Sequence, residues 1–401
     1  RAHLGAQHYS ECNLKTPQAM IEIIDKKHCC GCHACATACP VHCITMKADE
    51  QGFLYPIVDK EACTQCGLCE RVCPVIHQGA RRQPQSVYAA KSKNEEVRMQ
   101  SSSGGIFTHL AEAVIKDGGV VFGARFDKHW HVVHAHVNNM EELPMLRGSK
   151  YVQSIIGDTY KEAKELLLQE KKVLFVGTPC QIAGLKRYLR KEYANLLTVD
   201  IVCHGVSSPL VWDTYLSEIC RKQTSPIAGI SFRDKTYGWK KYRFHIRYAG
   251  STDTPSSGNV FMKGFLKDLY LRPSCHACPA RSGKSCSDIT LGDFWGIQKH
   301  YPQIDDDKGT SLVLIHSDKG QALYDSIEKE HTEAKLENAL CENPSIVQDP
   351  PESEYSQLFW QQFPLKGIAC IEPICRKAGP PRLLILYLKV KWALLDIFKR
   401  K

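Results

Sequence analysis

The spacing C-x2-C-x2-C-x3-C-P, which occurs twice between residues 29 and 74, constrains this sequence more than any other feature. The first copy consists of Cys29, Cys32, Cys35, Cys39 and Pro40, and the second of Cys63, Cys66, Cys69, Cys73 and Pro74. The first three thiolates of such a loop bind three irons of one cubane cluster, whereas the fourth leaves on a helix and points at the neighbouring cluster. We therefore expect two [4Fe–4S] clusters, each with three ligands from one copy and the fourth from the other.

By this logic, one cluster has the ligands Cys29, Cys32, Cys35 and Cys73, and the other has Cys63, Cys66, Cys69 and Cys39. The alternative is a pair of zinc sites, which CxxC pairs alone could form. Two identical four-cysteine patterns that both end in proline favour the clusters. The segment resembles a bacterial two-cluster ferredoxin module, for which we expect a small α+β fold. Cys30 and Cys43 lie outside the pattern, and we expect them to pack rather than to ligate.

Cysteine content and charge restrict the function classes. Twenty cysteines among 401 residues, many in the run CCGCHACATAC, are spaced too tightly for a disulfide framework. With no signal-peptide pattern, they indicate metal–thiolate chemistry in a reducing, cytoplasmic compartment. The net charge of +9 is concentrated in residues 376–401, which hold eight Lys or Arg and one Asp. The remaining chain is nearly balanced, so we expect no nucleic-acid partner.

The sequence divides into five segments. Residues 1–19 form an extension without assigned function, 20–76 the ferredoxin-type domain, 77–86 a polar linker, 87–365 an α/β domain and 366–401 a basic amphipathic tail. Helical and strand-like runs alternate over 87–330, which predicts a largely parallel core sheet. No apolar run reaches 18 residues, so we expect no transmembrane helix. Residues 381–401 could form a helix on an anionic membrane surface, peripheral at its inner face, or a helix that docks on protein.

A third group of four cysteines lies in the larger domain. Cys180 and Cys203 follow the strand-like runs VLFVG and LLTVDIV, and Cys275 and Cys278 form a CxxC motif. Parallel neighbouring strands would bring Cys180 and Cys203 to the same carboxyl edge of the sheet. We expect a third iron–sulfur cluster here, and a zinc site and unligated thiols are the alternatives. Cys286 lies close by in the sequence and could replace one ligand.

Two further segments have the composition of binding loops. Ser101–Val114 places three serines and two glycines before a predicted helix, where free backbone N–H groups and the helix dipole favour an anion or phosphate. The alternative is a flexible linker with an N-cap. The second segment, RGSKYVQS, offers Arg147, Lys150 and Tyr151 to a phosphate or an aromatic ring, or it forms a solvated basic loop.

Taken together, the segments SSSGGIF, RGSKYVQS, VLFVGTPCQIAGLK, DIVCHGVSSP, FRDK, RPSCHAC and SDITLGDFWG resemble, in this order, the family of coenzyme F420 hydrogenase/dehydrogenase beta subunits. The resemblance spans residues 20–330 and includes the fused ferredoxin module. It implies an α/β flavoprotein domain that binds FAD and an iron–sulfur cluster. The implied ligands of the cluster beside the flavin are Cys180, Cys203, Cys275 and Cys278. The implied flavin-site residues are Ser102, Ser103, Gly104, Gly105, Lys150 and Tyr151.

The resemblance also implies an oxidoreductase that passes electrons between a hydride carrier, FAD and [4Fe–4S] clusters, with coenzyme F420 as the candidate substrate. A flavin converts hydride transfer into single-electron transfer. The alternatives are a ferredoxin-fed reductase of an organic substrate and a non-catalytic electron-transfer subunit. His204 is a candidate for a proton shuttle, and the alternative is that it only hydrogen-bonds locally. Arg233, Lys235, Asp293 and Trp295 match family motifs without an assigned role. We expect a protein electron partner or a small ferredoxin, and a homo-oligomer remains open.

Overall fold

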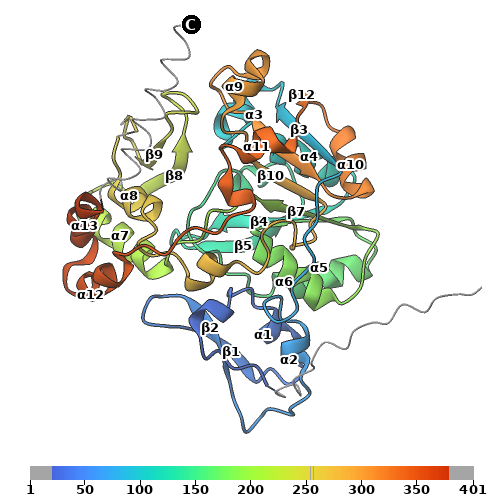
Figure 1. The fold of residues 1–401 in the computed structure, drawn as a ribbon, viewed down its shortest axis with the longest axis vertical. Helices are drawn as coiled ribbons and strands as arrows, with labels where there is room; N and C mark the ends of the chain where they lie inside the picture. Colours follow the sequence, from blue (N-terminus) through green and yellow to red (C-terminus); the bar gives the residue numbers. More distant parts are fainter. Residues whose placement is uncertain (1–19, 253, 256, 379–401) are drawn as a thin grey trace, which may run out of the picture.

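The structure is a computed structural model that describes residues 20–252, 254–255 and 257–378. The extension 1–19 and the segment expected to form a tail helix, 381–401, lie outside the described residues. Three parts are visible in Figure 1: a small N-terminal module, a large central sheet covered by helices, and a lateral part. The core of the lateral part is rich in aromatic residues. Among the described residues, no helix is long and apolar enough to cross a membrane.

The N-terminal module is built around its cysteines. It comprises η1 (Lys26–His28), α1 (Ala34–Ala38), β1 (Ile44–Ala48), β2 (Leu54–Val58) and α2 (Leu68–Arg71). Strands β1 and β2 pair as an antiparallel hairpin. The core of the module contains Cys35, Cys39, Cys69 and Cys73 packed with Ile21 and Ile44. A core made largely of thiols is too small to stabilise a domain unless the thiols also bind metal.

The central sheet has eight strands in the order β12-β3-β11-β10-β7-β6-β4-β5. Its strands are β3 (Ser86–Lys91), β4 (Val120–Phe126), β5 (Val132–Val137), β6 (Val173–Gly177), β7 (Leu196–Ile201), β10 (Ile289–Asp293), β11 (Ser311–Ile315) and β12 (Glu330–Glu333). The four adjacent strands β10, β7, β6 and β4 run parallel, which confirms the expected parallel core. The strands on either side of this core pair antiparallel.

Helices cover both faces of the sheet. On one face lie α4 (Ile106–Lys116) and α10 (Asp318–Asp325), and on the other lie α5 (Thr159–Leu168), α6 (Pro179–Leu189), α9 (Ile297–His300) and α11 (Leu336–Leu340). Alternate residues of β6 divide between the layers, because Leu174 packs with α4 while Val173 and Phe175 pack with α5 and α6. Burial on both faces explains why β6 and β7 read as continuous apolar runs.

The lateral part joins segments that are distant in the sequence. It contains α7 (Pro209–Cys220), β8 (Ile227–Asp234), β9 (Arg243–Tyr248), α8 (Val260–Leu266), α12 (Ser356–Lys366) and α13 (Ile371–Lys377). Their shared core is built around Trp212, Phe232 and Phe261. Ile371 and Ile374 are fully buried in this core, so the packed chain extends to Lys377, beyond the boundary expected at residue 365. The shorter elements are α3 (Glu95–Gln100), η2 (Leu143–Leu146), η3 (Pro273–Ala277), η4 (Pro302–Ile304), η5 (Pro344–Ile346) and η6 (Gly367–Cys370).

The N-terminal module is packed directly on helix α6. At Gly184, an added Cβ would lie 2.9 Å from both Cβ and Sγ of Cys32 and 2.9 Å from the Tyr160 hydroxyl. Only glycine allows such a close approach of a helix to a cysteine loop. Cys30, Cys32 and Ala34 accordingly share one apolar cluster with α5 and α6.

Candidate iron–sulfur and flavin site

Two small cavities lie within the N-terminal module, one for each expected cluster. The first is lined by Cys29, Cys32, Cys35 and Cys73, together with Cys30. The second is lined by Cys39, Cys63, Cys66 and Cys69, together with Cys43. The structure thus brings three cysteines of each copy together with the last cysteine of the other copy. Four thiolates around one cavity are the donor set that a [4Fe–4S] cluster requires.

The backbone repeats as closely as the cysteines do. Gly31 and Gln65, which occupy the same place in the two copies, both have positive φ, and so do His33 and Gly67 two residues later. Left-handed residues that alternate with right-handed ones turn successive N–H groups toward one concave side, which suits a bound anion or an iron–sulfur cluster. A non-glycine residue in this conformation is uncommon, so Gln65 and His33 indicate a turn imposed by the site.

The third group of cysteines converges at the carboxyl edge of the sheet. Helix α6 begins with Pro179, so Cys180 lies in its first turn, and Cys203 follows strand β7. Cys275 lies in η3 and Cys278 directly follows it. Burial raises the pKa of the Cys203 thiol well above its ordinary value, and the nearby Cys275, Cys180 and Cys278 raise it further. Four thiols this close together repel as thiolates, and bound metal removes that penalty.

The cysteine groups offer the donor set of a cubane cluster. Among the described residues, no group of three or more His, Cys, Asp or Glu side chains converges closely enough to hold one ion. A cubane cluster takes one thiolate at each of four irons, so its ligands surround a volume instead of meeting at a point.

Three cysteines outside the cluster sets occupy different environments. Cys30 is buried next to Cys180, and contact between the two thiols raises the pKa of Cys180. Cys43 lies with its Sγ 3.4 Å from Sγ of Cys39. Cys286 lies away from the third group, with its Sγ against the Lys284 carbonyl at 3.6 Å and against Gly79 of the linker. The structure therefore gives no support for Cys286 as a replacement ligand.

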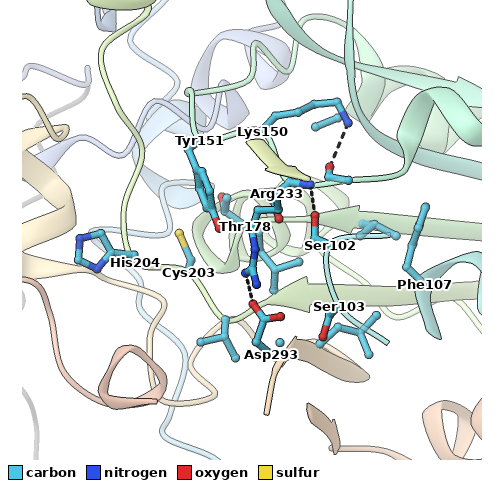
Figure 2. A pocket seen from close by; sticks show the side chains of 18 of the residues that line it. Ser102, Ser103, Phe107, Lys150, Tyr151, Thr178, Cys203, His204, Arg233 and Asp293 are labelled. Carbon is cyan, nitrogen blue, oxygen red and sulfur yellow. Dashed lines mark hydrogen bonds and ion pairs between the residues drawn. The ribbon is translucent and has the colours of Figure 1, made fainter. Parts of the chain in front are cut away.

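A pocket with a volume of about 480 Å³ opens at the same edge of the sheet. Figure 2 shows part of its lining, which includes Ser102, Ser103, Phe107, Lys150, Tyr151, Thr178, Cys203, His204, Arg233 and Asp293. This volume lies within the range of ligand and cofactor pockets. In α/β sheets, ligands bind beyond the carboxyl ends of parallel strands. Cys203 lines the pocket and also belongs to the third cysteine group, so the two sites adjoin.

The serine and glycine loop forms one wall of this pocket. Ser101, Ser102, Ser103 and Gly105 line it, whereas Gly104 does not. Gly104 instead packs on the sheet, where an added Cβ would lie 2.4 Å from the carbonyl oxygen of Ala90. Among the described residues, the backbone N–H groups of Ser102, Ser103 and Gly105 have no protein partner. Free N–H groups before the eleven-residue helix α4 suit a phosphate.

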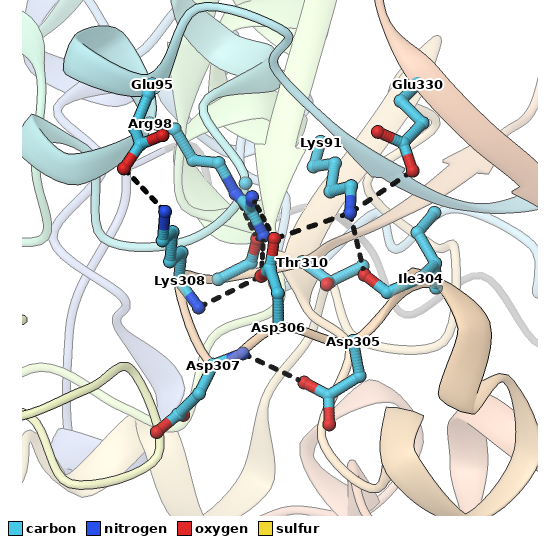
Figure 3. Close-up of polar contacts among 12 residues, drawn as sticks. Lys91, Glu95, Arg98, Ile304, Asp305, Asp306, Asp307, Lys308, Thr310 and Glu330 are labelled. Carbon is cyan, nitrogen blue, oxygen red and sulfur yellow. Dashed lines mark hydrogen bonds and ion pairs between the residues drawn. The ribbon is translucent and has the colours of Figure 1, made fainter.

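A cluster of ion pairs holds this loop in place (Figure 3). The Arg98 guanidinium donates to the Asp306 carboxylate and to the Gly309 carbonyl. Burial alone would raise the pKa of Asp306, but the bonds from Arg98 and from the Lys308 amide lower that pKa to about 2. Lys235, which directly follows β8, lies against the same loop, and its ammonium donates to the carbonyls of Arg98, Ser103 and Lys308. Lys235 is 3% exposed, so its role is to hold the wall of the pocket.

The segment Arg147–Tyr151 forms a wall that adjoins this loop. The Lys150 ammonium donates to the carbonyls of Arg147 and Gly148, both at 3.1 Å, and burial lowers its pKa to about 7. The Ser149 N–H donates to the hydroxyl of Ser102 at 2.7 Å, which ties the two walls together. The Tyr151 ring stacks on Phe265, with ring centroids 4.9 Å apart.

Arg233 and Asp293 form an ion pair in the lining of the pocket. Asp293, at the end of β10, accepts hydrogen bonds from the Arg233 guanidinium and from the Trp239 indole. The Arg233 guanidinium lies 4.2 Å from the ring centroid of Tyr242 and 5.0 Å from that of Trp295. Its Nε and Nη2 atoms are buried without a hydrogen-bond acceptor. Asp288 has a structural role, because it accepts from the Thr198 N–H and hydroxyl.

His204 lies on the rim of the pocket beside the third cysteine group. Its Nε2 is hydrogen-bonded to the Asp268 carboxylate at 2.5 Å, and its ring meets Phe265 edge to face. This pairing fixes the orientation of the imidazole. No residue pattern pointed to Asp268, because the partner lies 64 positions further along the chain.

Family models match most of the described chain. Residues 28–76 match the "4Fe-4S dicluster domain". Residues 87–157 match the N-terminal part, and residues 170–338 the C-terminal part, of the "Coenzyme F420 hydrogenase/dehydrogenase, beta subunit".

Individual proteins are similar over most of the chain. One of the proteins of the F(420)H(2) dehydrogenase of Methanosarcina mazei is 23% identical over 78% of this chain and 86% of its own length. "Coenzyme F420-dependent sulfite reductase" of Methanocaldococcus jannaschii is 32% identical over 77% of this chain, which spans about half (47%) of that protein. In the solved F420-reducing [NiFe] hydrogenase complex of Methanosarcina barkeri, one chain matches at a TM-score of 0.44 and 19% identity, over 64% of this chain and 84% of that one. With consecutive matches to both halves of one family and the motifs in their expected order, the chain belongs to the family of coenzyme F420 hydrogenase/dehydrogenase beta subunits.

Proposed function

We propose that this chain is an iron–sulfur flavoprotein oxidoreductase that passes electrons between a hydride carrier of the coenzyme F420 type, an FAD and three [4Fe–4S] clusters. Family membership and the dicluster domain support the coarser part, an iron–sulfur protein of oxidoreductase type. The names of two relatives support F420 as the carrier. The observation that carries the proposal is the position of Cys203, which lines the large pocket and also belongs to the third cysteine group.

The residues of the pocket suit the parts of an FAD. The free N–H groups of Ser102, Ser103 and Gly105 would bind the diphosphate, and Lys150 would neutralise part of its charge. Tyr151, held by its stacking on Phe265, offers a flat surface for a ring. The buried Arg233 supplies hydrogen-bond donors and positive charge in the pocket lining. When bound, the flavin supplies the exchange between hydride and single electrons.

The cysteine groups form a continuous series from the pocket to the surface. Cys203 adjoins the pocket, and Cys180 of the same group contacts Cys30 of the N-terminal module. Helix α6 presses Gly184 against Cys32, an expected ligand of the first ferredoxin cluster. Cys66, at the second ferredoxin cluster, is exposed. We therefore place the docking site of a protein electron partner at the second cluster.

The test is an anaerobic absorbance titration of the reconstituted full chain with reduced coenzyme F420, with NADH as the control. The proposal expects bound FAD, followed by bleaching of the flavin and then of the clusters by reduced F420 and not by NADH. Bound FAD that only dithionite or reduced ferredoxin bleaches would contradict the F420 assignment and favour a ferredoxin-fed reductase. Intact clusters without bound flavin would contradict the flavoprotein assignment and favour an electron-transfer subunit.

A further inference from the structure

Arg272 lies between the N-terminal module and the third cysteine group. It is 1% exposed and immediately precedes η3, which carries Cys275. The hydrogen-bond partners of its guanidinium are two backbone carbonyls, the side-chain amide of Gln153 and the thiol of Cys29. Among the described residues, the guanidinium forms no ion pair with a carboxylate. A buried cation without a counterion is strongly unfavourable. The site therefore requires negative charge from another source.

One side of Arg272 contacts the first ferredoxin site. Its Nε donates to the Cys29 carbonyl at 2.8 Å, and its Nη2 lies 3.6 Å from Sγ of Cys29. The guanidinium lies 4.4 Å from the ring centroid of Tyr55. Gly31 passes directly over it, since an added Cβ would lie 2.8 Å from Nη1 of Arg272. The cysteine loop is thus wrapped around this side chain.

The other side of Arg272 faces the third site. Its carbonyl accepts a hydrogen bond from the Cys275 N–H at 2.8 Å, which fixes the start of the CxxC segment. Cys29, whose carbonyl the guanidinium contacts, is followed directly by Cys30, and the Cys30 thiol touches Cys180 of the third group. One buried cation therefore lies against the cysteine segments of two sites.

We propose that Arg272 is the shared counterion of the first ferredoxin cluster and the third cluster, and that it raises the reduction potentials of both. This inference rests on the proposed function, since it requires that both sites hold clusters. A cluster held by four thiolates becomes more negative on reduction, and a nearby buried cation favours the reduced form. The second ferredoxin cluster, at Cys39, Cys63, Cys66 and Cys69, has no contact with Arg272 and provides an internal reference.

The experiment is an anaerobic redox titration of the reconstituted full chain, followed by electron paramagnetic resonance, for wild type, Arg272→Gln and Arg272→Lys. Signals are assigned with a Cys203→Ser variant, which lacks a ligand of the third cluster, and a Cys66→Ser variant, which lacks a ligand of the second ferredoxin cluster. The expected result for Arg272→Gln is at least a tenfold loss in the one-electron reduction equilibrium of the first and third clusters, which is a shift of 59 mV to more negative potential. The second ferredoxin cluster keeps its potential, and Arg272→Lys recovers most of the loss.

Several results would overturn the inference. Unchanged reduction potentials in an Arg272→Gln variant with full iron content would contradict the electrostatic role. Equal shifts of the reduction potentials in the Gln and Lys variants would show that Arg272 only positions the cysteine segments. If Arg272→Gln loses its iron, Arg272→Lys decides, because it keeps the charge without the planar set of hydrogen bonds. Potentials near wild type in that variant support a counterion, and a tenfold change contradicts it. Absence of the third cluster from wild type would instead refute the proposed function.

Discussion

Replacing Asp306 with Asn tests the ion-pair cluster that holds the serine loop. The pKa of Asp306 is about 2, compared with an ordinary 3.8, and at 1.36 kcal/mol per pKa unit the difference corresponds to at most ~2.5 kcal/mol. The Asp306 side chain is 37% exposed, so solvent screening reduces this to about 1–2 kcal/mol. The matched control is Glu95→Gln. Glu95 pairs with Lys308 in the same cluster but is 68% exposed, and we expect a loss below about 0.5 kcal/mol.

Urea unfolding of the cluster-free chain, followed by tryptophan fluorescence, measures both losses. Trp239 reports on this region, because its backbone N–H donates to the Asp307 carbonyl at 2.7 Å. A carboxylate with a lowered pKa stabilises the fold above its unfolded pKa, so the cost of Asp306→Asn should be constant above pH 5 and shrink as the pH falls from about 4 to about 2. Equal losses of unfolding free energy in Asp306→Asn and Glu95→Gln would contradict the role of this ion pair in holding the loop. A cost of Asp306→Asn that does not change with pH would contradict it as well.

The remaining predictions concern the pocket and the second cluster site. Gly104→Ala should destabilise the fold by about 1–3 kcal/mol, because the added Cβ would meet the backbone of Ala90 and Ser311. An unchanged melting temperature in thermal unfolding would contradict this packing. Lys150 has a pKa of about 7, so it loses its positive charge as the pH rises from 7 to 9. The affinity of the chain for FAD, measured by titration calorimetry, should therefore fall by at most about tenfold per pH unit, and Lys150→Met should show no such fall. Cys43→Ala should retain wild-type iron content, and loss of the second cluster would show that this thiol is a ligand.

The sequence predicted much of the site because its signals are local. Cysteine spacing indicated which thiols gather around each cavity, and the ends of two apolar runs indicated where Cys180 and Cys203 meet. The parallel core of the sheet followed from the alternation of helices and strands. These features depend on periodicity or on contacts within one motif, which a linear pattern records.

The features that the sequence did not predict depend on long-range contacts. Arg272 contacts Cys29 across 243 positions, and no periodicity links the two. The burial of Lys235 against three carbonyls depends on how separate loops pack. Gly104 matched the composition of a phosphate loop, yet its neighbours in space make it a packing residue. Residues 366–377 were grouped with the basic tail, although Ile371 and Ile374 complete the aromatic core.

In the proposed function, electrons leave the pocket through the third cluster. Rapid mixing of reduced coenzyme F420 with FAD-loaded wild type and Cys203→Ser, under anaerobic conditions, tests it most directly. We expect wild type to reduce flavin and then the ferredoxin clusters. In Cys203→Ser we expect flavin reduction at an unchanged rate, while the ferredoxin clusters stay oxidised. Reduction of those clusters at the wild-type rate in a variant that lacks the third cluster would contradict the route.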